Sequence, residues 1–282
     1  MDGVTEKISE YFTAATRLNA RQDGDYIGED GLLYCGKCKT SKQVKGRFMG
    51  EDIIYPCMCD CKAEEEREKE RQARARQRER YIDELRHNAF PRYSEYSLMT
   101  FDNADNSNEK QMNAARRYCE QFKEFEREGK GLLLYGNCGT GKSFTAACIA
   151  NKLIDSGIKV LFTTLPKIVS RLQATFDGKG EIYDELRHIP LLILDDFRSE
   201  RSTEFMQEVA FEVINGRIEA NRPLIVTTNL TAAEIKGNKD RAEQRIFSRL
   251  LQITIPIEFE GEDKRIEAGK RDYAADKARL GL

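Results

Sequence analysis

Histidine is almost absent from this chain, and no long apolar run occurs in it. Only His87 and His188 are present among 282 residues, so a metal site near the N-terminus has no imidazole to use. The apolar runs are too short to cross a bilayer, which predicts no membrane contact. The first residues have neither the basic region nor the apolar stretch of a signal peptide, so we expect a cytoplasmic protein.

An excess of one charge sign is also missing. The formal net charge is −2, although 33% of the residues are charged. No overall field therefore draws the protein to nucleic acid or to a membrane surface, and any such contact must be local. Hydrophobic residues make up 40% of the chain, which is enough for a core, and the length fits one large domain with something smaller.

A glycine-rich stretch carries the strongest functional signal. Residues 131–135 form an apolar run, which is followed by the pattern G-x-x-x-x-G-K-S and then by good helix formers. A strand, a glycine-rich turn and a helix in this order bring backbone N–H groups and a helix N-terminus to phosphate oxygens. We expect Lys142 to reach the β- and γ-phosphates of ATP and the Ser143 hydroxyl to ligate Mg²⁺. The expected nucleotide-binding residues are Gly136, Asn137, Cys138, Gly139, Thr140, Gly141, Lys142 and Ser143.

A second signal is the apolar run 191–194, which ends in Asp195 and Asp196. Such a run is typical of a parallel strand buried on both faces, and α/β sheets bind ligands at the carboxyl ends of their strands. We predict that Asp195 holds Mg²⁺ and that Asp196 activates the attacking water. Asn229 ends another apolar run and would bond that water or the γ-phosphate; alternatively it only begins a turn.

The hydrophobic periodicity outside these motifs fits an α/β fold. Further strands are expected at residues 158–164, 223–229 and 253–257, and helices at 108–128, 203–220 and 262–280.

Five of the eight cysteines lie before residue 62. Cys35 and Cys38 form a C-x-x-C knuckle, and the group Cys57, Cys59 and Cys61 follows after a stretch, residues 42–54, that is expected to turn as a hairpin. Four thiolates satisfy tetrahedral Zn²⁺, and a small domain with a sparse core needs such a staple. We predict a structural zinc site from four of these five residues, with Cys57 preferred and Cys61 as its rival. A dithiol redox pair and unrelated buried thiols are the alternatives.

The composition divides the chain into three parts. Residues 1–62 hold an amphipathic helix at about 5–20 and the zinc-binding domain. Residues 63–88 are almost wholly charged, with opposite charges at i,i+3 and i,i+4, which predicts a linker helix; its basic second half could instead touch phosphates. Residues 89–282 carry the nucleotide motifs and are expected to form the ATPase domain.

With these motifs established, the chain resembles the AAA+ ATPases, and among them the bacterial and phage replicative-helicase loaders of the DnaC/DnaI type. The match covers about residues 88–270. Beyond the phosphate-binding loop it rests on residues 192–197, 199–204, 215–217, 223–230, 248–250 and 261–265. The resemblance implies an AAA+ P-loop parallel sheet flanked by helices, and ATPase activity.

The resemblance also implies roles for particular residues. Asn229 would be the first sensor, Arg249 the finger that reaches a neighbour's nucleotide, and Arg265 the second sensor. Arg245, one turn before Arg249, is the alternative finger. Asp196 stands where most AAA+ proteins have glutamate, and its shorter reach implies slow hydrolysis, stimulated by DNA or by a partner.

Three functions fit these features. The first is an ATP-dependent loader that self-assembles with ATP, binds single-stranded DNA and contacts a hexameric replicative helicase through its N-terminal domain. The second is a transposition helper ATPase of the IstB type, which shares nearly the same core but generally lacks a cysteine cluster. The third is a zinc-binding interaction protein whose nucleotide site is only structural; measuring ATP turnover with and without single-stranded DNA separates it from the other two.

Overall fold

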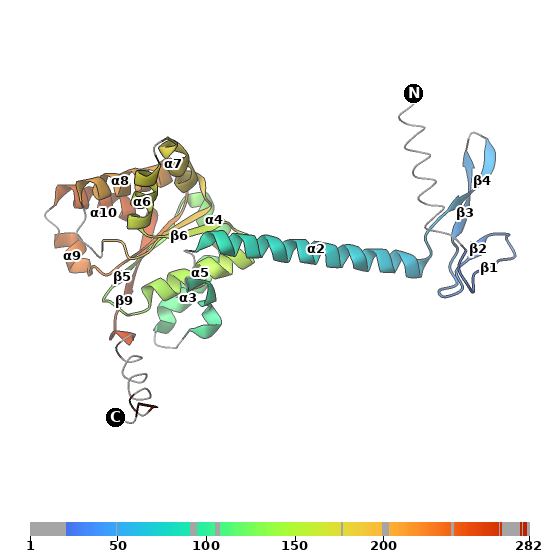
Figure 1. The fold of residues 1–282 in the computed structure, drawn as a ribbon, viewed down its shortest axis with the longest axis horizontal. Coiled ribbons are helices and arrows are strands. Elements are labelled where there is room, and N and C mark those ends of the chain that lie inside the picture. Colours follow the sequence, from blue (N-terminus) through green and yellow to red (C-terminus); the bar gives the residue numbers. More distant parts are fainter. Residues whose placement is uncertain are drawn as a thin grey trace. The chain divides into compact units, whose positions relative to one another are not determined.

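The computed structural model describes residues 21–48, 50–90, 95–104, 108–175, 177–198, 203–237, 240–264, 266, 277, 279 and 280. The expected helix at 5–20, most of the expected helix at 262–280, and Arg265 lie outside the described residues. The chain forms two compact units, residues 1–79 and 80–282, each with its own packing (Figure 1). The three-part division at residues 62 and 88 stays a prediction. In the described part of the chain, every helix is too short or too polar to cross a bilayer.

The first unit contains two short antiparallel sheets. β1 (Tyr26–Ile27) pairs with β2 (Leu33–Tyr34), and β3 (Gln43–Phe48) pairs with β4 (Glu51–Pro56). The second pair confirms the hairpin expected between the two cysteine groups. The buried apolar side chains among the described residues of this unit are Leu32, Leu33, Cys35 and Cys59. A core of this size is too small to stabilise a domain without a further constraint.

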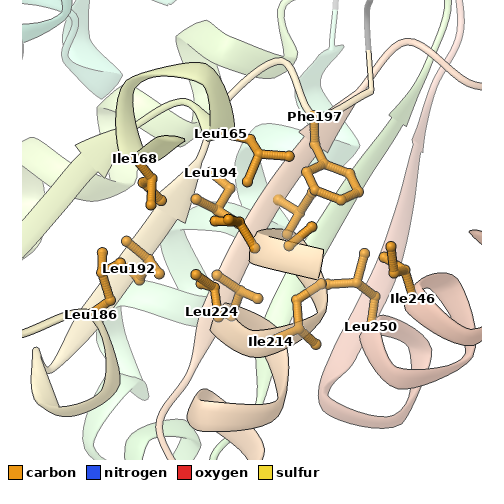
Figure 2. Packing of buried hydrophobic residues seen from close by; sticks show 14 of the residues in the cluster. Leu165, Ile168, Leu186, Leu192, Leu194, Phe197, Ile214, Leu224, Ile246 and Leu250 are labelled. Atoms are coloured by element: carbon orange, nitrogen blue, oxygen red, sulfur yellow. The ribbon is translucent and has the colours of Figure 1, made fainter. Parts of the chain in front are cut away.

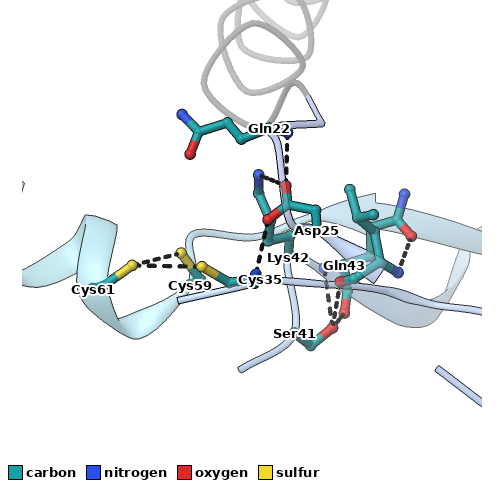
Figure 3. Close-up of polar contacts among 10 residues, drawn as sticks. Gln22, Asp25, Cys35, Ser41, Lys42, Gln43, Cys59 and Cys61 are labelled. Carbon is teal, nitrogen blue, oxygen red and sulfur yellow. Dashed lines mark hydrogen bonds and ion pairs between the residues drawn. The ribbon is translucent and has the colours of Figure 1, made fainter. Parts of the chain in front are cut away.

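A buried ion pair adds to this small core. Lys42 Nζ lies 2.6 Å from Asp25 Oδ2, and each side chain is 3% exposed. The backbone N–H groups of Gln22 and Gly36 also donate to the Asp25 carboxylate, at 2.8 and 3.0 Å (Figure 3). The hydrogen bond from Lys42, with those from the two amides, holds the pKa of Asp25 well below its usual range. Because Gly36 lies between Cys35 and Cys38, the same carboxylate fixes the cysteine knuckle.

The charged region forms one helix, α2 (Asp60–Ala89), which confirms a helix over the expected linker. Its first half carries ion pairs at helical spacing, such as Lys69–Glu65 at 2.7 Å and Arg71–Glu68 at 2.6 Å. Exposed pairs of this kind contribute only a few tenths of a kcal/mol each. Its last turns belong to the second unit, where Leu85 and Ala89 are buried in the core.

The second unit is built on a five-stranded parallel sheet with the order β6-β7-β8-β5-β9. The strands are β5 (Gly131–Gly136), β6 (Val160–Thr163), β7 (Leu191–Leu194), β8 (Leu224–Thr228) and β9 (Thr254–Phe259). All residues of β7 and β8 are buried, as expected for strands covered on both faces. The predicted α/β fold with a parallel sheet is therefore confirmed.

Helices cover both faces of this sheet (Figure 1). Two short 3₁₀ turns, Glu95–Leu98 and Phe101–Asn103, precede α3 (Glu109–Glu120) and α4 (Phe122–Glu128). The helix expected over 108–128 is thus interrupted at Gln121. The remaining helices are α5 (Lys142–Asp155), α6 (Leu165–Ala174), α7 (Lys179–His188), α8 (Glu204–Glu219), α9 (Ala232–Gly237) and α10 (Arg241–Ile253).

Alternate residues of the central strands point into two separate cores. Leu192 and Leu194 of β7 pack with side chains of α6, α7, α8 and α10, whereas Leu191 and Ile193 pack on the opposite face with α3 and α5. Figure 2 shows the first core, in which Leu165, Ile214 and Leu250 converge on the strands. This double cover holds the carboxyl ends of β5, β7 and β8 at one edge of the sheet, where the polar motifs lie.

Candidate nucleotide site and cysteine cluster

The glycine-rich loop connects β5 to α5, as the sequence predicts. Gly136, Gly139 and Gly141 all have positive φ angles, which L-residues with side chains rarely adopt. A Cβ atom on Gly136 would lie 2.2 Å from the carbonyl oxygen of Phe259 in β9, so no larger residue fits there. The loop therefore turns tightly against the neighbouring strand and ends at the N-terminus of a 14-residue helix.

Lys142 is the first residue of that helix and is only 5% exposed. Its Nζ donates to the carbonyl oxygen of Gly136 at 2.9 Å, so the ammonium group lies over the loop. The loop is also held from outside, because Asn108 Nδ2 donates to the carbonyl oxygen of Thr140 at 2.6 Å. A cation and a helix N-terminus are thus fixed at one place, which suits an anionic ligand.

The two carboxylates after β7 have different surroundings. Asp195 is 3% exposed and accepts hydrogen bonds from the Thr227 hydroxyl at 2.7 Å and from the Tyr96 hydroxyl at 3.0 Å. Asp196 is exposed, has a φ of 54°, and accepts a hydrogen bond from Asn229 Nδ2 at 3.0 Å. Asp195 is therefore fixed and buried, whereas Asp196 faces solvent beside the side chain of Asn229.

Both motifs line one cavity of about 530 Å³, a volume typical of sites for small ligands. Its lining includes Gly139, Gly141, Lys142 and Ser143 of the loop together with Asp195, Asp196 and Asn229. Apolar groups of Met99, Ala104 and Met112 complete the wall. Backbone amides, a lysine, a hydroxyl and two carboxylates are the donor set that a nucleotide triphosphate with Mg²⁺ requires, so these residues fit that ligand.

Four cysteines of the first unit converge on one point. The sulfur atoms of Cys35, Cys38, Cys59 and Cys61 all lie within 4.8 Å of one another. Figure 3 shows the Cys61 sulfur facing two of them, with Sγ–Sγ distances of 3.6 Å to Cys35 and 3.5 Å to Cys59. Four thiolates around Zn²⁺ at tetrahedral geometry would be about 3.8 Å apart. The group therefore fits a tetrahedral metal site and contains more thiols than a dithiol pair needs.

The structure groups Cys61, and not the preferred Cys57, with the other three sulfurs. Cys57 lies outside the group, and its thiol is directed to the carbonyl oxygen of Ser41 at 3.5 Å. Cys61 takes its place because α2 begins at Asp60, and the first helical turn brings the Cys61 sulfur to the knuckle. Hydrogen bonds with Cys59 and the other thiols raise the pKa of Cys61 in the absence of a cation, and metal binding by thiols releases their protons.

A comparison with protein families decides the identity of the larger unit. The family described as IstB-like ATP binding protein matches residues 64–270, which is most of the chain. The chain belongs to this family of ATP-binding proteins. The cavity, with its glycine-rich loop and its two carboxylates, lies wholly within the residues that match this family of ATP-binding proteins.

Curated relatives of this IstB-like protein include helicase loaders. Replicative helicase loader DnaI of Bacillus subtilis (strain 168) is 28% identical over 180 residues, which is 59% of this chain and 58% of the relative. Replicative helicase loader DnaC of Escherichia coli (strain K12) is 27% identical over 140 residues, 48% of this chain and 57% of that one. The chain thus spans somewhat more than half the length of these two relatives.

Solved structures share the fold. The crystal structure of DnaI superimposes with a TM-score of 0.53 and 22% identity, covering 64% of this chain and 98% of that one. The crystal structure of the DnaC helicase loader gives a TM-score of 0.51 with 22% identity, covering 59% of this chain and 99% of that one. The expected resemblance to loaders of this type is confirmed for the fold.

The arginines expected to act on a neighbour lie away from the nucleotide cavity. Arg245 and Arg249 of α10 are exposed and line a separate depression with Phe211. The Arg245 guanidinium lies over the Phe211 ring, 4.6 Å from its centroid, whereas Arg249 Nη1 lies 3.5 Å from Gln252 Oε1. Both guanidinium groups therefore contact a side chain of their own chain, and Arg249 stays the preferred candidate for a finger.

The IstB-like site also contains residues that the sequence reasoning missed. The Thr227 hydroxyl donates to the Asp195 carboxylate and accepts a hydrogen bond from the backbone N–H of Asp196. Thr227 lies two residues before Asn229 on the same strand, and this position could have marked it as a site residue. Lys264 lines the cavity and adds a second lysine there. Its backbone N–H donates to the carbonyl oxygen of Gly139 in the loop at 3.2 Å. Tyr96 belongs to no motif, and no local signal marks it.

Proposed function

We propose that this protein is an ATP-dependent loader of a replicative DNA helicase onto single-stranded DNA during replication initiation. The observation that carries the proposal is the convergence of the phosphate-binding loop, Asp195, Asp196 and Asn229 on one cavity, in a chain whose relatives are named replicative helicase loaders. ATP occupancy would set the state of the protein, and hydrolysis would end a loading event.

In this proposal the residues of the cavity have separate tasks. The loop amides and Lys142 bind the phosphates, and Ser143 and Asp195 would hold Mg²⁺, which neutralises charge on the transferring phosphoryl group. Asp196, which is exposed to solvent and accepts a hydrogen bond from Asn229 Nδ2 at 3.0 Å, would accept a proton from the attacking water. Because aspartate reaches less far than glutamate, we propose slow turnover that DNA or a partner stimulates.

Self-assembly would complete the site. Arg249 is exposed on α10 and does not line the nucleotide cavity of its own chain. We propose that it projects to the γ-phosphate bound by a neighbouring subunit, where an arginine supplied in trans accelerates hydrolysis by about 10³–10⁵ in well-studied switch proteins. Arg265, which lies outside the described residues, stays the proposed second sensor.

The first unit is proposed to bind one structural Zn²⁺ through Cys35, Cys38, Cys59 and Cys61 and to contact the hexameric helicase. The grouping of four sulfurs supports the metal, and the small core of this unit supports a structural rather than a catalytic role. With the helicase contact on the first unit, the nucleotide cavity of the second unit stays accessible to the arginine of a neighbouring subunit.

The name of the matched family favours a second candidate, a transposition helper ATPase of the IstB type. The two functions require different partners, a hexameric helicase or a transposase. The cysteine cluster and the names of the relatives favour the loader.

The test uses the full-length protein with the replicative helicase encoded in the same genome. We expect ATP-dependent transfer of that helicase onto circular single-stranded DNA, measured by co-sedimentation with the circle. Lys142→Ala should abolish the transfer, and Cys61→Ser should abolish helicase binding while nucleotide binding persists. Transfer that is equal without ATP, or binding of a transposase in place of the helicase, would reject the loader.

A further inference from the structure

Tyr96 lies outside the nucleotide motifs and contacts the buried carboxylate of Asp195. It lies in the 3₁₀ turn Glu95–Leu98, upstream of the phosphate-binding loop. Its hydroxyl donates to Asp195 Oδ2 at 3.0 Å, although the two residues are 99 positions apart in the sequence. Tyr96 also lines the cavity that holds the loop and both carboxylates.

Two contacts fix the direction of this side chain. The Tyr96 ring packs on Phe162 of β6 with ring centroids 4.6 Å apart. Asn151 of α5, which is 3% exposed, donates from Nδ2 to the carbonyl oxygens of Tyr96 and Met99, each at 2.8 Å. The turn is therefore fastened to the helix that follows the phosphate-binding loop, and the ring to a strand beside β7, so that the hydroxyl is held at Asp195.

The Asp195 carboxylate has four lone-pair sites, of which two are occupied from opposite sides. Thr227 donates to Oδ1 at 2.7 Å and Tyr96 donates to Oδ2 at 3.0 Å. As far as the described residues are concerned, this leaves one acceptor site on each oxygen for the water molecules of a hydrated cation. A carboxylate that is 3% exposed also needs such donors to stay charged without bulk water.

We propose that Tyr96 is a positioning residue that fixes the Asp195 carboxylate for Mg²⁺ binding at the nucleotide site. The inference rests on the proposed function, because it concerns the metal that accompanies ATP in that site. The Tyr96 hydroxyl donates to Asp195, whereas Asp196 is held by Thr227 and Asn229. Loss of the hydroxyl should therefore weaken the contribution of Mg²⁺ and leave the metal-free affinity for nucleotide unchanged.

The experiment compares Tyr96→Phe with the parent protein, both at full length. The affinity for a fluorescent, non-hydrolysable ATP analogue is measured with Mg²⁺ and with EDTA, and Mn²⁺ binding in the presence of the analogue is followed by electron paramagnetic resonance. We expect equal affinities in EDTA and an Mg²⁺-dependent gain that is about tenfold smaller in Tyr96→Phe, since one hydrogen bond to a charged group is lost. The Mn²⁺ affinity should fall by a similar factor.

Tyr118→Phe is the matched control. Tyr118 is 2% exposed and donates its hydroxyl to the carbonyl oxygen of Lys130 at 3.1 Å, away from the cavity, so its loss should leave the Mg²⁺-dependent gain unchanged. Thermal unfolding of both variants reports any loss of folding.

Four results would overturn an assignment. A parent-like gain in Tyr96→Phe, or a larger one, would show that the hydroxyl does not fix Asp195 for the cation. An equal loss of affinity in EDTA and in Mg²⁺ would make Tyr96 a packing or nucleotide contact. A smaller gain in Tyr118→Phe as well would make the effect one of general stability. A parent protein that does not bind the analogue would instead reject the proposed function.

Discussion

Arg217 is a buried arginine. Its replacement should destabilise the second unit and leave nucleotide binding by the folded protein unchanged. The side chain is 0% exposed, and no carboxylate in the described ranges lies within salt-bridge distance of it. Its Nη1 atom donates to carbonyl oxygens at the end of α7 and before β7, including that of Ile189, and Nη2 donates to that of Pro223 before β8. Arg217 therefore joins the starts of the two strands whose far ends carry Asp195 and Asn229.

The magnitude follows from the groups that Arg217→Met would leave without a donor. Three of the hydrogen bonds, to Leu186, Ile189 and Pro223, are buried. A buried group left unsatisfied costs about 1–3 kcal/mol, which gives about 3–9 kcal/mol for three. Removing a buried cation that lacks a carboxylate partner returns part of this, so we expect a net loss of about 3–6 kcal/mol. At about 2–4 °C per kcal/mol for a unit of this size, the Tm should fall by about 6–24 °C.

The assay is thermal unfolding of the full-length protein, with nucleotide-analogue binding measured well below the transition. Arg171→Met is the matched control, because Arg171 pairs with Glu185 at the surface, 2.7 Å apart with side chains 47% and 39% exposed, and such a pair is worth less than about 1 kcal/mol. A Tm for Arg217→Met within a few degrees of that for Arg171→Met would refute the reasoning. Loss of analogue binding in folded Arg217→Met would show that Arg217 also serves the nucleotide site.

Three further predictions concern the metal, the hydrolysis step and the assembly. Purified protein should contain close to one zinc per chain by elemental analysis. Cys61→Ser should lose the zinc and Cys57→Ser should keep it, because of these two residues only Cys61 lies in the sulfur group. Equal zinc content in both variants would contradict this ligand set. Asp196→Asn should bind ATP normally but release phosphate more slowly than the parent, since the amide cannot accept the proton of the attacking water; turnover at the parent rate would remove Asp196 from that role. Arg249→Ala and Lys142→Ala should each be inactive alone and should regain part of the ATPase activity when they are mixed on single-stranded DNA. A fully active Arg249→Ala, with an ATP hydrolysis rate per chain that is independent of protein concentration, would argue against a shared site.

Contiguous motifs could be interpreted from the sequence because their geometry is local. The loop from Gly136 to Ser143 is contiguous in sequence, and its glycines supply the positive φ angles that the turn needs. The unbroken apolar run of β7 requires cover on both faces, which indicates a parallel sheet and places Asp195 and Asp196 at its ligand-binding edge. Neither inference depends on distant parts of the chain.

Equally spaced candidates could not be distinguished in this way. Cys57, Cys59 and Cys61 offer three thiols at the same interval, and spacing alone favours none of them. The choice depends on where β4 ends and α2 begins: the helical turn from Asp60 carries Cys61 back to the knuckle and leaves Cys57 beside Ser41. Similarly, the break at Gln121 between α3 and α4 has no proline or glycine to mark it.

The sequence by itself determined the nucleotide chemistry, the sheet class and the presence of a thiol cluster, because each is encoded in residues that are neighbours along the chain. Only the tertiary structure decided which groups surround those residues. Tyr96 reaches Asp195 across 99 positions, and Arg217 joins strand ends that are far apart in the chain. Such contacts depend on how the helices pack on the sheet, and a hydrogen bond needs its two atoms within about 3 Å, a condition that no local pattern specifies.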